Sequence, residues 1–186
     1  MTEVSTSAIR GYVAGKWSID PVHSEVGFSV RHMMVSKVRG RFTEFSGEIV
    51  TGDNPTDSSV TAEISLASIN TGSEQRDDHI KSADFFEVET YPTMTYQSTG
   101  VRADGDDFIV DGDLTLKGVT KSVALRLELN GFGPDAYGGT RAGFTATAEI
   151  NRREFNVNFS APMQNGGAVV ADKIAIHLEI EAVLAS

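Results

Sequence analysis

The sequence contains no cysteine among its 186 residues. The fold therefore relies on neither disulfide bonds nor thiolate metal sites. Long apolar runs are also absent, since no stretch approaches the ~20 consecutive apolar residues of a membrane-spanning helix. Residues 1–15 hold only isolated apolar positions such as Ile9 and Val13, fewer than the apolar core of a secretory signal requires. As written, the sequence predicts a cytoplasmic protein, or a periplasmic or secreted one if a leader has been removed.

Positive charge is scarce. Lys and Arg number 16 against 26 Asp and Glu, which gives a formal net charge of −10 at pH 7. No cluster of Lys and Arg stands out along the chain. Nucleic acids and anionic membrane surfaces both attract positively charged proteins, so this balance disfavours them as partners. We expect no nucleic-acid partner and no stable membrane insertion.

The composition is that of one ordinary globular domain, with 40% hydrophobic and 23% charged residues. A chain of this length can bury roughly two-thirds of the surface that it exposes when unfolded. Repeats, low-complexity tracts and breaks in composition are absent. We predict a flexible N-terminal extension over residues 1–15 and a single domain over residues 16–186.

From Trp17 onward, apolar and polar residues alternate with a period of two, which is typical of β-strands with one buried face. Eight segments show the pattern, near residues 26–30, 38–42, 60–66, 94–96, 108–116, 123–129, 144–150 and 174–180. A helix is indicated over residues 73–81, where Ser73 is a candidate N-cap, and a single helical turn is an alternative for residues 33–35. Eight such strands must hide eight apolar rows on one side of a sheet. A closed barrel and a two-sheet sandwich both achieve this, so alternation alone predicts an all-β fold and leaves the choice open.

An eight-stranded barrel is either just filled by its own side chains or left with room for one small ligand. The inward rows mix large residues such as Phe28 and Phe144 with small ones such as Gly40, Gly112 and Ala146. We expect the small residues to leave space. An apolar lumen favours a long hydrocarbon chain, because burial is worth ~0.8 kcal/mol per methylene group. A core filled by the same side chains is the alternative at this point.

The predicted lumen lining consists of the inward apolar and aromatic side chains, together with two phenylalanines that follow the helix. These residues are Phe28, Val30, Phe42, Ala62, Ile64, Phe85, Phe86, Met94, Tyr96, Phe108, Val110, Leu125, Leu127, Phe144, Ala146, Ala148, Ile176 and Leu178.

Polar residues near the strand ends are candidates for contacts with a ligand head group: His32, Arg76, His79 and Arg152. Structural roles are the alternatives, with Arg76 paired locally to Asp77 and Arg152 paired to a carboxylate such as Glu149. His23, at the start of the first of these strands, could instead bond backbone carbonyls. The histidines lack the spacing of a helical or finger-type zinc site, so we expect no metal.

Several motifs follow one another along the chain: residues 17–24 (WSIDPVHS), 40–42 (GRF), 69–72 (INTG), 76–79 (RDDH), 82–86 (SADFF), 112–120 (GDLTLKGVT) and 150–152 (INR). In this order they resemble the YceI family of lipocalin-like, polyisoprenoid-binding proteins, over about residues 16–184. The resemblance implies an extended eight-stranded antiparallel lipocalin-like barrel with a short helix near its mouth. It also implies a long isoprenoid or fatty chain in the lumen and, often, a homodimer. Many family members carry a signal peptide, where this sequence has a polar extension.

We therefore expect a non-catalytic bacterial protein that binds, transports or stores a long-chain isoprenoid, of polyprenyl or isoprenoid-quinone type, or a fatty lipid. We expect no cofactor beyond that lipid. One alternative is an enzyme acting on a lipid-like substrate in the same barrel. It would need a carboxylate or histidine with a displaced pKa facing the lumen, and the inward rows contain none. The other alternative is a filled barrel that acts through its outer surface as an interaction module.

Overall fold

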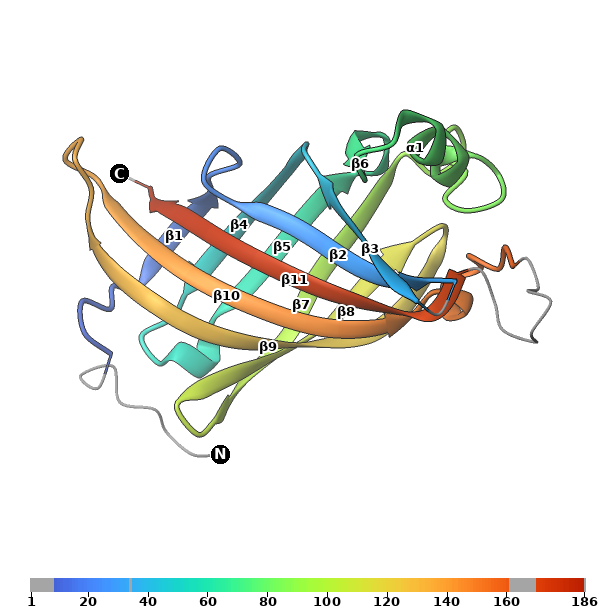
Figure 1. Ribbon diagram of the computed structural model, residues 1–186. Helices are drawn as coiled ribbons and strands as arrows, with labels where there is room; N and C mark the ends of the chain where they lie inside the picture. The colour runs from blue at the N-terminus through green and yellow to red at the C-terminus, as the bar shows by residue number, and fades with distance from the viewer. Residues whose placement is uncertain (1–8, 34, 161–169, 186) are drawn as a thin grey trace.

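The computed structural model describes residues 9–33, 35–160 and 170–185. Within them the chain forms one antiparallel sheet that curls into a barrel, with a single α-helix at one end (Figure 1). The strands are β1 (Gly15–Ile19), β2 (Glu25–His32), β3 (Ser36–Phe42), β4 (Phe45–Thr51), β5 (Ser59–Ser65), β6 (Ile69–Asn70), β7 (Thr93–Asp104), β8 (Asp107–Leu116), β9 (Val119–Pro134), β10 (Thr140–Asn151) and β11 (Val170–Leu184). The helices are α1 (Glu74–Lys81) and three 3₁₀ turns, η2 (Pro55–Asp57), η3 (Leu66–Ser68) and η4 (Arg152–Phe155).

The eleven strands form a closed barrel with eight positions around its wall, which we call staves. Three of the staves each consist of two consecutive short strands. Strands β1 and β2 form the first stave and β3 and β4 the second, since β1 pairs with β4 and β2 with β3. Strands β5 and β6 form the third, pairing with β4 and β3. Strands β7 to β10 follow in chain order, and β11 closes the barrel against both β1 and β2. The predicted eight-stranded antiparallel barrel is confirmed, and the sandwich alternative is wrong.

The register of the strands places the predicted apolar rows inside the barrel. On β2 and β3, Val26 lies opposite Phe42 and Val30 lies opposite Val38, and all four line the interior. Alternate residues between them face outward. In the period-two pattern of the sequence, the apolar residues thus face the inside of the barrel wall and the polar residues face the outside.

Two inward glycines do not leave the space that their size suggests. The ring of Phe28 covers Gly40, its cross-strand partner, and the ring of Tyr96 covers Gly112. A Cβ atom on Gly112 would lie 2.5 Å from the Tyr96 ring. The expectation that small inward residues open the lumen is therefore wrong for these glycines, because neighbouring aromatic rings fill their places.

The predicted helix is present as α1, and it lies at the end of the barrel where β6 ends (Figure 1). The Ser73 side chain accepts a hydrogen bond from the Arg76 backbone nitrogen at 3.3 Å, as expected of an N-cap. In the part of the chain that the structure describes, no helix is both long and apolar enough to cross a membrane.

Residues 9–14, the described part of the predicted extension, contact the barrel at the end opposite α1. The Tyr12 hydroxyl donates to the Gly52 carbonyl at 2.6 Å, and the Tyr12 ring meets Phe132 edge-on at 5.2 Å. Strand β1 begins at Gly15, one residue before the predicted boundary. The prediction for residues 1–8 lies outside the described residues.

Candidate functional site

A cavity of about 750 Å³ occupies the interior of the barrel. It extends from Tyr12 and Phe132 at one end to α1 and Arg152 at the other, and every stave contributes to its lining. This volume falls within the range of ~300–1,000 Å³ that is usual for small-molecule sites. The barrel is therefore not a filled core.

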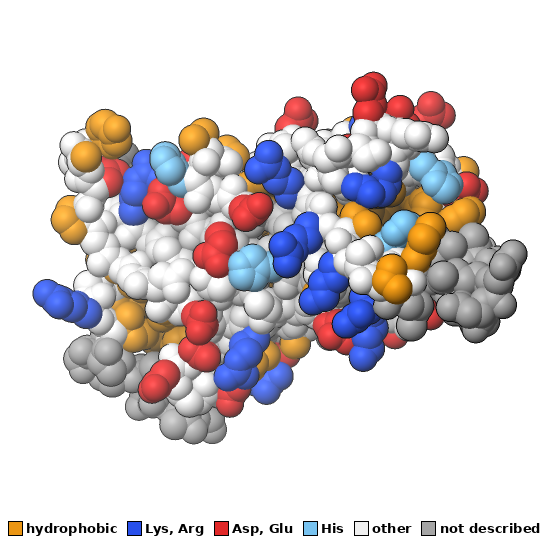
Figure 2. Space-filling view, viewed as in Figure 1, with side chains coloured by type: hydrophobic (Ala, Val, Ile, Leu, Met, Phe, Trp, Pro, Cys, Tyr) orange, Lys and Arg blue, Asp and Glu red, His pale blue; other side chains and the backbone are white. Residues whose placement is uncertain are grey.

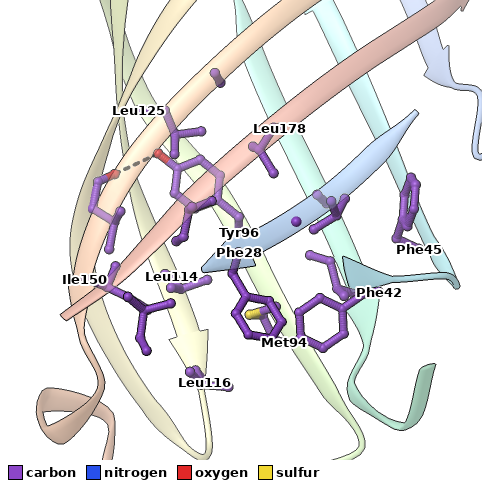
Figure 3. Close-up of a pocket in the computed structure, with 18 of the residues that line it drawn as sticks. Phe28, Phe42, Phe45, Met94, Tyr96, Leu114, Leu116, Leu125, Ile150 and Leu178 are labelled. Carbon is purple, nitrogen blue, oxygen red and sulfur yellow. Dashed lines mark hydrogen bonds between the residues drawn. The ribbon is translucent and has the colours of Figure 1, made fainter. Parts of the chain in front are cut away.

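The middle of the cavity is apolar. Figure 3 shows Phe28, Phe42 and Met94, from β2, β3 and β7, gathered on one side of it, with Leu114 and Ile150 nearby. The rings of Phe28 and Phe42 have centroids 5.8 Å apart. No carboxylate lies among the described residues that line the cavity.

Every residue predicted to face the lumen lines this cavity except Ala148. Ala148 is half-buried and packs against the core, while Ile176, directly opposite on β11, does line the cavity. Further lining residues were not predicted. Some belong to rows that alternation had identified, namely Val26, Val38, Val60, Leu114, Leu116, Val123, Leu129, Ile150, Ile174 and Ile180, and others to strands or segments that it had not, namely Tyr12, Ile19, Phe45, Ile49 and Phe132.

Tyr96 is the polar group nearest the middle of the cavity, but its hydroxyl is already bonded to the barrel. It donates to the Val123 carbonyl at 2.8 Å, with the Val110 carbonyl at 3.4 Å (Figure 3). Burial raises the pKa of the phenol above its ordinary value. Tyr96 therefore presents its ring, rather than an acidic hydroxyl, to the cavity.

At the α1 end, Arg76 and His79 line the cavity while bonding to their own segment. The Arg76 guanidinium donates to Thr71 Oγ1 at 2.8 Å and to the Thr71 carbonyl at 2.7 Å. Asp77 accepts from the Thr71 backbone nitrogen at 2.9 Å, so Arg76 and Asp77 share a partner rather than pairing directly. The His79 Nε2 atom lies 2.8 Å from an Asp84 carboxylate oxygen.

The His79 ring also helps to order the aromatic residues at this mouth. It meets Phe85 and Phe159 edge-on, at centroid distances of 5.1 and 5.0 Å. Phe85 and Phe86 both line the cavity, as predicted for the segment that follows the helix.

Arg152 is buried, with 3% of its surface exposed. Its guanidinium donates to the carbonyls of Ala171 at 2.9 Å, Val157 at 2.8 Å and Val170 at 3.2 Å. Burial lowers the pKa of this group from its ordinary value. The structural alternative for Arg152 is thus supported: its hydrogen bonds go to carbonyls, and its carboxylate neighbour is Asp172 at 3.6 Å, whereas Glu149 pairs with Lys173.

His32 differs from the other three head-group candidates. It is half-buried at the last position of β2 and lines the cavity, and among the described residues no partner hydrogen-bonds its ring. Within the described part of the chain, both ring nitrogens of His32 are thus available to a ligand at the mouth.

The opposite end of the cavity is closed by hydrogen-bonded side chains. The Trp17 indole nitrogen donates to Thr51 Oγ1 at 2.9 Å, and that hydroxyl donates to the Val13 carbonyl at 2.7 Å. Trp17 is fully buried. We refer to this end of the cavity as its floor and to the α1 end as its mouth.

An acidic cluster on the outside of the barrel brings Asp20, His23 and Glu181 together. His23 Nδ1 lies 2.7 Å from Asp20, in place of the backbone carbonyl bond that was one prediction for it. The Arg141 Nη1 atom donates to Asp20 at 2.8 Å and to Glu181 at 2.7 Å, so the guanidinium of Arg141 already pairs with both carboxylates. Arg141 and His23 hold the pKa of the Asp20 carboxyl far below its ordinary value.

Comparison with known proteins agrees with this geometry. Residues 17–182 match the sequence profile of the YceI-like domain. Protein YceI of Escherichia coli is 41% identical over 148 residues, which cover 78% of each chain. The crystal structure of BcnA from Burkholderia cenocepacia has the same fold, with a TM-score of 0.75 and 24% identity over 88% of this chain and 98% of that one.

A third relative is described as a polyisoprenoid binding domain from Saccharophagus degradans implicated in plant cell wall breakdown. Its fold matches with a TM-score of 0.70 and 18% identity, over 93% of this chain and the whole of that domain. The family profile spans nearly the entire barrel, and the resemblance seen in the sequence motifs is confirmed. The chain belongs to the YceI-like family.

Proposed function

We propose that this barrel binds a long-chain isoprenoid of polyprenyl or isoprenoid-quinone type, or another fatty lipid, with the tail in the cavity. The observation that carries the proposal is the apolar cavity of about 750 Å³. Burial of each methylene group is worth ~0.8 kcal/mol, so a lining of this kind rewards chain length above all. Membership of the YceI-like family and the polyisoprenoid binding described for the Saccharophagus domain support the same ligand class.

The protein carries or stores its lipid without transforming it. The described lining offers no carboxylate to act as acid or base. Among the described residues, no buried side-chain nitrogen or oxygen lacks a hydrogen-bond partner. Two lining side chains without a hydrogen-bond or ion-pair partner among the described residues, Arg31 and His32, stand together at the end of β2, away from the apolar middle of the cavity.

The head group lies at the α1 mouth, where His32 is its first contact. Arg76 and His79 bond to residues beside their own helix, and Arg152 bonds to carbonyls of β11 and of the segment after η4, whereas the described structure gives the His32 ring no partner. A phosphate, phenol or quinone oxygen is a suitable partner for an imidazole N–H. His32→Leu should weaken binding of a lipid with a polar head more than binding of the bare hydrocarbon.

Extraction of the purified protein with organic solvent under denaturing conditions, followed by mass spectrometry, tests the proposal. We expect one long-chain lipid per barrel. A barrel that arrives empty and also rejects added isoprenoids and fatty acids would refute carriage. Recovery of a chemically altered lipid after incubation would instead identify an enzyme.

Two alanines of β10 supply a matched pair of variants. Ala146 lines the cavity and Ala148 does not. Ala146→Phe should therefore weaken uptake of a fluorescent fatty acid by about tenfold or more, because the added ring occupies ligand space. Ala148→Phe should weaken uptake less, because Ala148 itself does not line the cavity. Circular dichroism of both variants checks that the barrel is intact, and equal uptake by the two would contradict the assignment of the cavity.

A further inference from the structure

The hairpin of β2 and β3 is cationic, in a chain whose net charge is −10. Residues 26–43 contain four Lys and Arg and no Asp or Glu. Strand pairing sets Arg31 opposite Lys37 and places Arg39 and Arg41 farther along the same outer face. All four are exposed. Figure 2 shows blue side chains gathered over the part of this face where β2 and β3 run.

No ion pair engages these four side chains among the described residues, although acidic residues lie on the neighbouring strand. On β11, Asp172 is bound to Arg153 at 2.7 Å and Glu179 lies 3.0 Å from His177. The four side chains thus form a positive patch that no ion pair neutralises within the described residues, although Glu25 of β2 and Glu179 of β11 lie near its Arg41 end. The expectation that Lys and Arg form no cluster is wrong, because the charges are spread over eleven residues of sequence and only strand pairing brings them together.

The tip of the same hairpin is apolar and exposed. Val35 keeps 85% of its surface exposed and Met33 keeps 42%. Figure 2 shows orange side chains toward this end of the hairpin, beside the blue ones. A soluble polyanion offers nothing to bury these side chains, whereas a bilayer accepts apolar groups below its charged surface.

The tip also stands at the mouth of the cavity. His32 at the end of β2 lines the cavity, as do Val30 and Val38 on the inner face of the hairpin. One hairpin thus has an inner face toward the ligand site, a cationic outer face and an apolar tip. On the other side of the mouth, α1 carries the acidic Glu74, Asp77 and Asp78 against the basic Arg76 and Lys81, so a negative surface attracts the hairpin and gains nothing from the helix.

We propose that the β2–β3 hairpin docks this protein on an anionic lipid bilayer, with its apolar tip among the head groups and the cavity mouth at the membrane surface. The net charge of −10 does not prevent this, because charges beyond the Debye length of ~8 Å at physiological ionic strength are largely screened. The salt solution therefore screens the acidic residues on the far side of the barrel from the membrane, whereas the hairpin charges lie close enough to interact with it. Docking goes beyond the proposed lipid binding and does not require an occupied cavity.

Flotation with phospholipid vesicles tests the proposal. Wild-type protein should bind vesicles of phosphatidylcholine with ~30% phosphatidylglycerol and should not bind phosphatidylcholine alone. The variant Lys37→Gln with Arg39→Gln removes two charges from residues that do not line the cavity, and it should bind at least ~10-fold more weakly. Val35→Ser should weaken binding at high salt as well, since it removes an apolar contact.

The matched control removes two charges from the opposite side of the barrel. Arg102→Gln with Arg126→Gln changes the net charge equally, and its vesicle binding should equal that of the wild type. Equal binding by the hairpin variant and the wild type, or binding to both vesicle types alike, overturns the proposal. Binding to a single-stranded oligonucleotide without binding to vesicles also overturns it, and would assign the face to a soluble polyanion.

The lipid content of the same variants separates this inference from the proposed function. We expect the hairpin variant to yield its lipid on solvent extraction but to fail to float with vesicles, which would show that docking and storage are distinct properties. A wild-type protein that floats with vesicles, but whose cavity is empty and rejects added isoprenoids and fatty acids, would support docking and contradict lipid carriage.

Discussion

A single absent side chain at position 112 allows Tyr96 to lie across β8 and reach the backbone of β9. The ring rests where a Gly112 side chain would stand, and the hydroxyl bonds the Val123 carbonyl. Alternation in the sequence predicts that both residues face inward, because it reports the face of a strand. Alternation does not show that the Tyr96 ring fills the space beside Gly112, since that depends on which strands are neighbours.

Gly112→Ala should destabilise the barrel by about 1–3 kcal/mol, because the new methyl group overlaps the Tyr96 ring. Gly100 on β7 is the matched control, since a Cβ there would meet nothing within 4 Å. Gly100→Ala should change stability by less than ~0.5 kcal/mol. Urea denaturation measures both, and equal effects would contradict the role of Gly112 as a seat for the ring.

Asp20 should make stability depend on pH in the acid range. Hydrogen bonds from Arg141 and His23 lower its pKa in the folded protein below the ordinary value of 3.8. The unfolded chain therefore binds this proton first as pH falls, so the stabilisation is complete above ~pH 5 and is lost progressively below the ordinary pKa. Asp20→Asn should be less stable than the wild type near neutral pH, and the gap should narrow toward pH 2 in thermal melts. A constant gap would show that the carboxylate charge is not the cause.

At the scale of elements, the eight rows predicted from alternation correspond to the eight staves, but β1, β4 and β6 were not predicted. Strands β1 and β6 have only five and two residues, so they offer little periodicity to detect, whereas β4 has seven but places Gly47 and Thr51 in its inward row and Val50 on the outer face, which weakens the alternation. Their pairing completes the first three staves. The cavity residues Ile19, Phe45 and Ile49 were missed for the same reason, whereas Ala148 was included because alternation does not report how far a side chain reaches past its neighbours.

The turn η4 and the start of β11 are joined at the mouth by Arg152. Its side chain holds three carbonyls, one in the segment after η4 and two in β11. Sequence could not distinguish it from Arg153, which is exposed and pairs with Asp172 at 2.7 Å. Burial alone separates a structural arginine from a surface one.

Arg152→Met should cost about 3 kcal/mol of stability, because it leaves buried carbonyls without a donor at similar side-chain volume. Arg153→Met should cost less than ~1 kcal/mol, since exposed ion pairs contribute little. Urea denaturation of the two variants gives the comparison. If Arg152→Met kept full stability and lost only lipid binding, Arg152 would act on the head group instead.

At the scale of the whole molecule, the described strands form staves that follow one another in chain order, and the pairing of β1 and β2 with β11 joins the first strands to the last. That closure brings the first and last strands side by side: the Ala185 backbone nitrogen donates to the Lys16 carbonyl at 2.8 Å. This junction lies at the floor of the cavity, away from the α1 mouth (Figure 1).

The adjacency makes this barrel a candidate for circular permutation. A short linker joining Ala185 to Ala14, with new ends opened between Tyr137 and Gly138 in the exposed β9–β10 turn, should preserve every stave. The permuted chain should melt cooperatively and extract with the same lipid as the wild type. New ends placed instead within residues 82–92 would cut the segment that lines the mouth, and that permutant should fold but lose its lipid. The binding site thus depends on the order of the staves around the ring and not on which stave comes first in the chain.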